Sequence, residues 1–147
     1  MRKLMGRQSG FTLLEILVAL IILSIGLLGL AGLQATGLRS NHSGYLRSQA
    51  TIFAYEMADR MRANRAVAIA GNYNIDFSDG VPSGTEIQNV DRRDWLNTLA
   101  ASLPSGDGQI DCDNTGLCTI EIQWVDNRNL AATDPNYYIT FPTTTQL

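Results

Sequence analysis

Apolar residues are distributed very unevenly along this chain of 147 residues. Residues 11–33 are almost wholly apolar and include a single charged side chain, Glu15. A helix of 23 residues is roughly 35 Å long, enough to cross a hydrocarbon layer of roughly 30 Å with some tilt. The pattern therefore predicts a membrane-spanning helix over residues 11–33.

Beyond residue 33 the apolar positions recur at helical spacing. Five of them fall on one helical face: Leu46, Ala50, Phe53, Met57 and Met61. We expect the same helix to continue over residues 34–70 as an amphipathic segment that packs this stripe against the rest of the chain. Three basic residues, Arg60, Arg62 and Arg65, lie near its predicted end, where positive charges interact favourably with the helix dipole. We interpret them as a solvated helix end rather than a nucleic-acid surface.

Residues 71–147 have the mixed composition of a small soluble head. Residues 72–89 are rich in Asn, Asp, Ser and Gly and predict a loop. Asp91 is expected to cap a short helix that ends near Leu103. The apolar face of that helix comprises Trp95, Leu96, Leu99 and Leu103.

Strand patterns follow in the last third of the chain. Apolar and polar residues alternate over 118–124, and residues 137–141 form a second β-prone run. With a partner strand reached through Cys112, they predict a small antiparallel sheet. The expected fold class is α+β. A long N-terminal helix, which spans the membrane in its first half and is amphipathic in its second half, is expected to pack on that sheet.

Charge is as uneven as hydropathy. Arg2, Lys3 and Arg7 precede the apolar run with no acidic residue among them. Basic residues flanking a membrane helix favour the cytoplasmic side, so we expect a cytoplasmic N-terminus and an exported head. Without residues 1–10 the chain keeps eight basic and fourteen acidic side chains, a net charge of −6. That balance argues against a dedicated nucleic-acid binder, which presents a basic face.

The two cysteines, Cys112 and Cys118, both lie in the predicted exported head. A small exported domain with an even number of cysteines favours a disulfide. A zinc site needs two further ligands, and the single histidine, His42, is distant in sequence. We therefore expect a disulfide between Cys112 and Cys118, and no metal.

Residues 111–116 (DCDNTG) are a candidate calcium loop of the EF-hand type. Asp111, Asp113 and Thr115 occupy its first, third and fifth positions, but Ile122 stands where the bidentate carboxylate belongs. We expect a turn bridged by the disulfide instead. The sequence contains no phosphate-binding glycine loop, metal cluster or nucleophile–base pair, so we expect neither an enzyme nor a cofactor.

The order of residues at the N-terminus differs from that of a secretory signal. Such a signal ends in a small-residue cleavage site, whereas here Ser9 and Gly10 come before the apolar run. Glu15 is also unusual, because a carboxylate at the bilayer centre costs about 2.5–3.5 kcal/mol and marks a function or a partner. The string Gly10-Phe11-Thr12-Leu13-Leu14-Glu15 resembles the type IV prepilin motif.

That resemblance implies a defined processing route. A membrane-bound prepilin peptidase is expected to remove residues 1–10 by cutting after Gly10, and to methylate the new amino terminus at Phe11. Glu15 becomes the fifth mature residue, where the family uses a glutamate for subunit docking. Its carboxylate is expected to pair with the Phe11 ammonium of a neighbouring subunit and so to fix the stagger of packed helices.

The resemblance extends to particular pilins. Residues 26–34, 45–50 and 58–64 resemble the minor-pilin family PilV, the type IV pilus modification proteins. Members are thought to prime pilus assembly at the inner membrane and to affect adhesion and twitching motility. The implied partners are prepilin peptidase, major and minor pilins, the inner-membrane assembly platform and membrane lipid. The protein is expected first in the inner membrane, with a periplasmic head, and then in the surface pilus.

Two other functions stay open. A minor pseudopilin of a type II secretion system shares the leader and architecture, although residues 59–64 favour the pilin. A pilus-tip adhesin or DNA-uptake subunit would use its head for recognition, for example through Tyr73, Tyr137 or Tyr138. Four glycines, Gly26, Gly29, Gly32 and Gly37, weaken the predicted helix. They fit either close packing of membrane helices or a segment that loosens in the filament.

Overall fold

The computed structural model of the protein describes residues 10–126, 133–134 and 137–147. In chain order the elements are α1 (Leu13–Ala63), α2 (Arg65–Ile69), α3 (Ile87–Ser102), β1 (Asp107–Cys112), β2 (Leu117–Val125) and β3 (Tyr138–Gln146). The chain divides into two compact units between Asn41 and His42. The predicted leader residues Arg2, Lys3, Arg7 and Ser9 lie outside the described residues.

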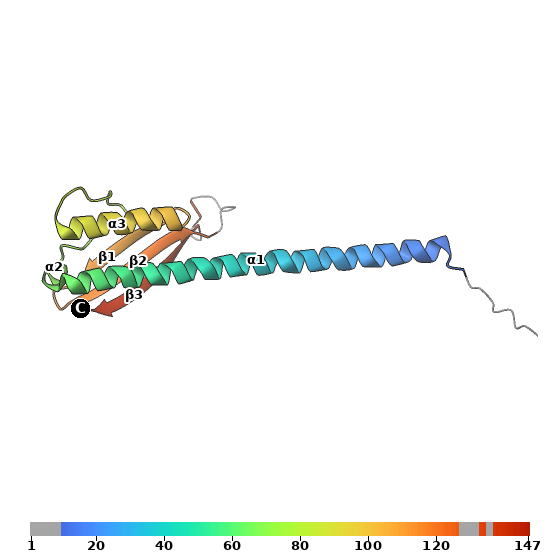
Figure 1. Ribbon diagram of the computed structural model, residues 1–147, viewed down its shortest axis with the longest axis horizontal. Helices are drawn as coiled ribbons and strands as arrows, with labels where there is room; N and C mark the ends of the chain where they lie inside the picture. Colours follow the sequence, from blue (N-terminus) through green and yellow to red (C-terminus); the bar gives the residue numbers. More distant parts are fainter. Residues whose placement is uncertain (1–9, 127–132, 135–136) are drawn as a thin grey trace, which may run out of the picture. The chain divides into compact units, whose positions relative to one another are not determined.

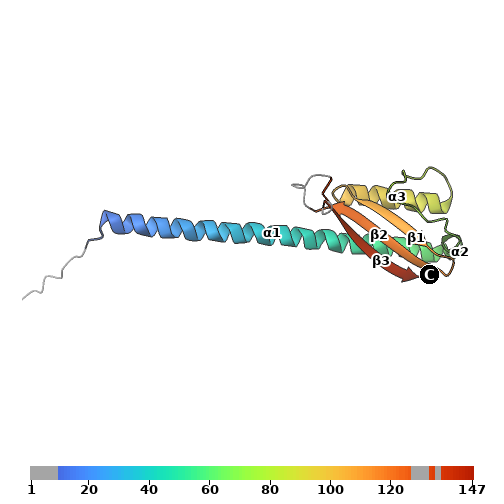
Figure 2. The same cartoon turned by 180° about the vertical axis from the view of Figure 1, so that it is seen from behind.

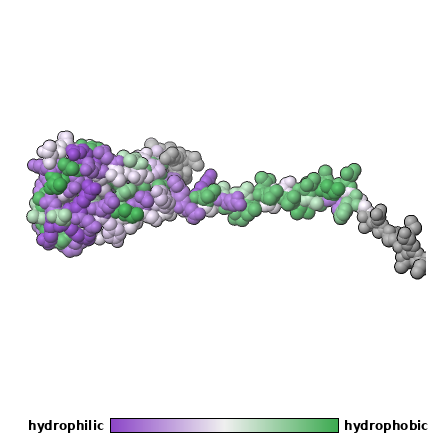
Figure 3. Space-filling view, in the orientation of Figure 1, coloured by the Kyte–Doolittle hydropathy of each residue, from purple (hydrophilic) through white to green (hydrophobic). Residues whose placement is uncertain are grey.

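The first unit is the N-terminal stretch of α1 (Figure 1). Its large apolar side chains are all exposed, from 46% at Val18 to 87% at Leu13. In the space-filling view this stretch is mostly hydrophobic on the visible face (Figure 3). Within the part of the chain that the structure describes, α1 is the one helix long and apolar enough to cross a membrane. An exposed apolar surface of this extent requires cover from lipid or from other helices.

The second unit is an α+β head. Strands β1, β2 and β3 form an antiparallel sheet in that order, and the C-terminal part of α1 lies beside it with α3 in both views (Figures 1 and 2). The side chains of β2 alternate, and those that point into the core are Cys118, Ile120, Ile122 and Trp124. Since this one face contacts the core residues of both helices, the head has two layers.

The predicted apolar faces of both helices are buried in this core. In α1 they are the five predicted positions, Leu46, Ala50, Phe53, Met57 and Met61, and in α3 the face predicted from Trp95 to Leu103 is also buried. The indole Nε1 of Trp95 donates a hydrogen bond to the Phe53 carbonyl at 3.0 Å. That bond satisfies a buried polar group and links the two helices.

Three boundaries differ from the sequence predictions. The helix starts at Ile87 rather than after Asp91, and the Asp91 carboxylate binds Arg60 and Tyr73 instead of capping. The long helix ends at Ala63, because Asn64 leaves helical geometry before the short α2. Gly71, at a φ of +78°, then ends α2. Strand β3 continues through Pro142 to Gln146, well beyond residue 141.

The two edges of the sheet are protected from further strand pairing in different ways. Outside β1, Ile75 and Ile110 exchange two backbone hydrogen bonds of 3.0 and 2.9 Å. The Asn74 amide extends this cover, accepting from the Cys112 amide at 2.9 Å and donating to its carbonyl at 3.3 Å. On the other edge, Pro142 stands opposite Glu121. The Leu147 amide donates a hydrogen bond to the Gly116 carbonyl, next to β2. Along an antiparallel strand the direction of the backbone groups alternates from residue to residue, so the nitrogen of Pro142 points away from β2. Proline is tolerated there because no hydrogen bond of the sheet is lost.

Candidate functional site: the N-terminal segment

The predicted cleavage position lies in exposed, non-helical backbone. Gly10, Phe11 and Thr12 precede the first residue of α1. A Cβ atom built at Gly10 would have no neighbour within 4 Å, and the Phe11 side chain is 81% exposed. The peptide bond between Gly10 and Phe11 is therefore free of steric cover from the described part of the chain.

Thr12 is the residue that caps α1. Its carbonyl accepts the amides of Glu15 and Ile16 at 3.1 and 3.3 Å. Its hydroxyl oxygen also accepts the Glu15 amide, at 3.2 Å. This is the geometry of an N-cap threonine, whose side-chain oxygen accepts an amide of the first helical turn.

Glu15 lies in the first turn of α1, where a negative charge complements the helix dipole. It lines a shallow apolar groove with five other side chains: Phe11, Ile16, Ala19, Leu20 and Leu23. The carboxylate is exposed, with apolar side chains beside it. It shares this groove with Phe11, the residue that processing would turn into an amino terminus. An opposite charge at Phe11 is the group best suited to pair with it.

This same segment matches the model of a known protein family. Residues 5–31 match the family model described as "Prokaryotic N-terminal methylation motif". The match makes the N-terminal segment type IV prepilin-like and implies processing by a prepilin peptidase and assembly with other pilins. Proteins with this motif are structural rather than catalytic. No curated protein and no solved structure matches the chain.

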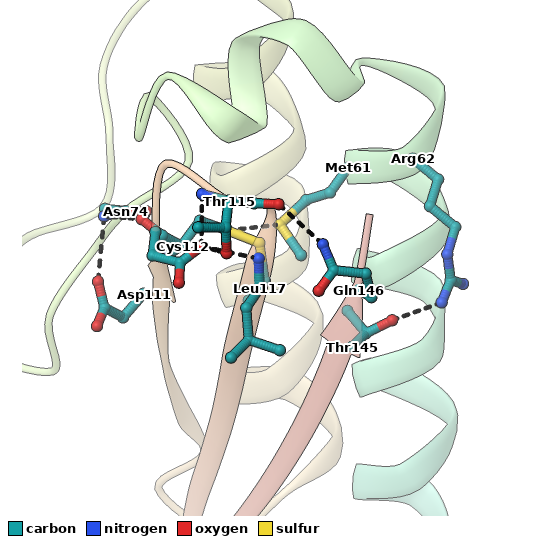
Figure 4. The surroundings of a disulfide bond; sticks show 11 residues. Met61, Arg62, Asn74, Asp111, Cys112, Thr115, Leu117, Thr145 and Gln146 are labelled. Atoms are coloured by element: carbon teal, nitrogen blue, oxygen red, sulfur yellow. Dashed lines mark hydrogen bonds between the residues drawn. A yellow bond between two sulfur atoms is a disulfide. The ribbon is translucent and has the colours of Figure 1, made fainter.

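In the head, the structure joins the two cysteines in the pairing that the sequence predicts. Cys112 and Cys118 are direct partners across β1 and β2, with their Cα atoms 4.0 Å apart. The bond is buried, and the Cys112 sulfur lies 3.9 Å from the Met61 sulfur of α1 (Figure 4). The disulfide therefore closes the hairpin at the point where the sheet packs on the end of α1.

The turn between these cysteines is organised by Asp113. Its Oδ1 atom accepts the hydroxyl and amide of Thr115 and the amide of Leu117, at 2.7, 2.8 and 2.9 Å. The Thr115 hydroxyl, followed by the backbone amides, lowers the pKa of this exposed carboxyl. In the described residues no group of three or more His, Cys, Asp or Glu side chains is arranged to hold a metal ion.

The three tyrosines considered for recognition have different environments. Tyr73 is fully buried, and its hydroxyl donates to Asp91 at 2.7 Å and accepts from Asn64 at 3.3 Å. It therefore belongs to the core and presents no recognition surface. Tyr137 is half-buried and Tyr138 is exposed, and their rings meet edge to face with centroids 4.9 Å apart.

Sequence reasoning missed two features of these sites. The Thr12 cap was visible in the sequence, because Thr-Leu-Leu-Glu has the S/T-x-x-E spacing of a capping box. The cover of the β1 edge by Asn74 and Ile75 had no comparable signal. It depends on a single bridge inside a polar loop, too short for a strand pattern to appear.

Proposed function

We propose that this chain is a minor pilin of a type IV pilus, similar to the PilV family, which primes or enters the filament. The single observation that supports this proposal best is the methylation motif at residues 5–31, which includes Gly10 and Phe11 at the cleavage position and Glu15 five residues into the mature chain. The role of the protein is structural. Its contribution to adhesion and twitching motility would come through the pilus.

The proposed life cycle follows from charge and hydropathy. The basic leader, residues 1–10, keeps the N-terminus in the cytoplasm, while the apolar stretch 11–33 crosses the inner membrane. The amphipathic stretch 34–70 and the head, residues 71–147, lie in the periplasm. Prepilin peptidase removes the leader, methylates Phe11 and leaves an ammonium group in an apolar setting. Pairing that ammonium with Glu15 of a neighbouring subunit offsets two costly charges and so favours helices in register.

The polar residues of the segment that resembles PilV make contacts within the head. Arg60 reaches Asp91 at 3.4 Å, and Arg62 donates to Asp59 at 2.7 Å and to Thr145 at 2.6 Å. These contacts attach the end of α1 to α3 and β3. The resemblance over residues 58–64 therefore concerns how the head is built, and the choice between minor pilin and pseudopilin needs a functional test.

Blocking the cleavage position tests the processing on which the proposal depends. Gly10→Val should leave a precursor that is longer by residues 1–10, because the peptidase requires a small residue before the scissile bond. Mass spectrometry of wild-type protein extracted from membranes should find methylated Phe11 at the amino terminus. An intact Met1 in wild-type protein that has entered pili would contradict the proposal.

A deletion strain distinguishes the pilin from the pseudopilin. Surface pili and secreted enzymes are measured separately in the deletion strain and after complementation with the wild-type gene. Loss of pili with normal secretion supports the minor pilin. Loss of secretion with normal pili identifies a pseudopilin.

A further inference from the structure

We propose that Thr12 is a positioning residue for processing: by capping α1 it keeps the Gly10–Phe11 peptide bond outside the helix, in a form that the peptidase can cleave. This inference rests on the proposed function. It assigns to Thr12 a role in the precursor, before any contact between subunits exists. Its observations come from the first unit alone.

The hydrogen bonds at Thr12 fix where the helix begins. The amide of Glu15 is held by both the carbonyl and the hydroxyl of Thr12, at 3.1 and 3.2 Å. Leu13 is therefore the first helical residue, and the scissile bond lies just upstream of the cap. Valine has nearly the shape of threonine but has no side-chain oxygen to accept this amide. The Glu15 amide would then keep only its bond to the carbonyl of residue 12, and the helix would lose its side-chain cap.

The position of the helix start matters because of the chemistry of peptide cleavage. Attack on the Gly10 carbonyl carbon places negative charge on its oxygen, which the peptidase must stabilise with hydrogen-bond donors. If the helix extended one turn upstream, that oxygen would accept the amide of Leu14 instead. Ser9 is the next residue upstream with a capping side chain. A cap there would make Gly10 and Phe11 the first two helical residues.

An observation independent of the geometry points to an enzyme at this bond. The methylation motif covers residues 5–31 and thus includes the bond, the cap and the first turns of α1. Gly10 and Phe11 are also free of steric cover. Access to the bond is therefore limited by backbone conformation rather than by neighbouring side chains.

The test compares cleavage rates of full-length precursors by purified prepilin peptidase in detergent micelles. Thr12→Ser and Thr12→Asn retain an N-cap oxygen with different side-chain shapes, whereas Thr12→Val retains the shape without the oxygen. We expect the Ser and Asn variants to be cleaved within about twofold of wild type, and Val at least about fivefold more slowly. A Val variant cleaved as fast as wild type would overturn the inference. So would an Asn variant as slow as Val, because recognition would then follow the threonine side chain itself.

A second measurement reads the conformation without the peptidase. In uncleaved precursors, the ¹³Cα chemical shifts of Gly10 and Phe11 should be non-helical for wild type, Ser and Asn, and should move toward helical values for Val. Slow cleavage of the Val variant without that movement would also overturn the inference. If wild-type precursor is not cleaved at all, the proposed function fails, and the chemical shifts still decide whether Thr12 sets the start of α1.

Discussion

Residues 13–41 and residues 42–63 are two stretches of the same helix, α1, and the first stretch is the more apolar of the two. In the first stretch every large apolar side chain is exposed, whereas in the second a stripe from Leu46 to Met61 is buried in the head. The second stretch gains stability within its own chain, at about 1.5–3 kcal/mol for each large apolar side chain buried. The first gains none there and depends on lipid or other helices.

Gly108 in the head differs in the same way from the four glycines of the first stretch of α1. A Cβ atom built at Gly26, Gly29, Gly32 or Gly37 would contact nothing within 4 Å. At Gly108 in β1 it would overlap the Trp95 ring and come within 2.8 Å of Leu99 Cδ1. Gly108 makes room for an aromatic ring of the same chain, whereas the four glycines of the first unit leave open surface that another molecule could occupy.

The largest effect is expected from Glu15→Ala, which changes only the first unit. The variant should be processed and should fold normally, because the head contains none of the atoms removed. It leaves the Phe11 ammonium of a neighbour without a partner in an apolar contact, which costs more than the intact pair. We expect at least about a tenfold fall in the amount found in sheared pili relative to the amount in membranes, since such losses reach about 3–5 kcal/mol.

Two results would change that conclusion. Equal incorporation of mutant and wild-type protein would show that Glu15 has no part in docking. Degradation of the mutant in the membrane would show that Glu15 supports folding.

Removal of the disulfide should act only on the head. The double variant Cys112→Ser, Cys118→Ser should lose about 2–3 kcal/mol of unfolding free energy, the entropy expected for a short closed loop. Trp95 and Trp124, the two tryptophans of the chain, are both buried in the head. Their fluorescence therefore reports unfolding of the head alone, even for full-length protein in detergent. Wild-type protein that reacts with two equivalents of thiol reagent before reduction would contradict the disulfide.

The glycine contrast predicts opposite outcomes for one substitution. Gly108→Ala should destabilise the head by about 1–3 kcal/mol, because the added methyl group overpacks the contact with Trp95. Gly29→Ala is the matched control and should leave head unfolding unchanged, while raising intrinsic helix propensity by about 1 kcal/mol. Tryptophan fluorescence during urea unfolding measures both. A neutral Gly108→Ala variant would show that the ring can move aside.

The smallest effect is expected from Tyr73→Phe, at about 1–2 kcal/mol for the lost hydrogen bond to Asp91. Burial, with help from that bond, raises the pKa of Tyr73 to about 12. The unfolded chain releases this proton near pH 10. The contribution of Tyr73 to the free energy of unfolding is therefore complete below pH 10 and is lost as the pH rises toward 12. Unfolding measured between pH 9 and 12 should therefore decline less steeply in the Phe variant. Parallel curves would contradict the raised pKa.

Much of the fold could be predicted from periodicity, because burial decides it. The stripe of α1, the face of α3 and the alternation of β2 were all readable from the spacing of apolar residues. The N-terminal site was readable for another reason, since its residues are consecutive. Its docking and processing roles remain proposals.

The features that were missed depend on partners distant in sequence. Asp91 resembles a helix cap, but its carboxylate is held by Arg60 and Tyr73. Pro142 reads as the end of a strand, yet its nitrogen faces away from β2, so β3 continues. Helix α1 ends where Asn64 turns toward Tyr73. No local pattern reports such contacts, since each exists only once the head has folded.

The protected edges of the sheet affect how one head can contact another. In the proposed pilus the heads of neighbouring subunits would lie close together, a setting in which open strand edges can pair from one molecule to the next. Here Asn74 and Ile75 occupy the hydrogen-bonding groups beside β1, and Pro142 removes an amide hydrogen from the middle of the outer edge of β3. Neither edge offers an unbroken ladder to a neighbour. In the proposed pilus we therefore expect neighbouring heads to contact each other through side chains rather than by strand pairing.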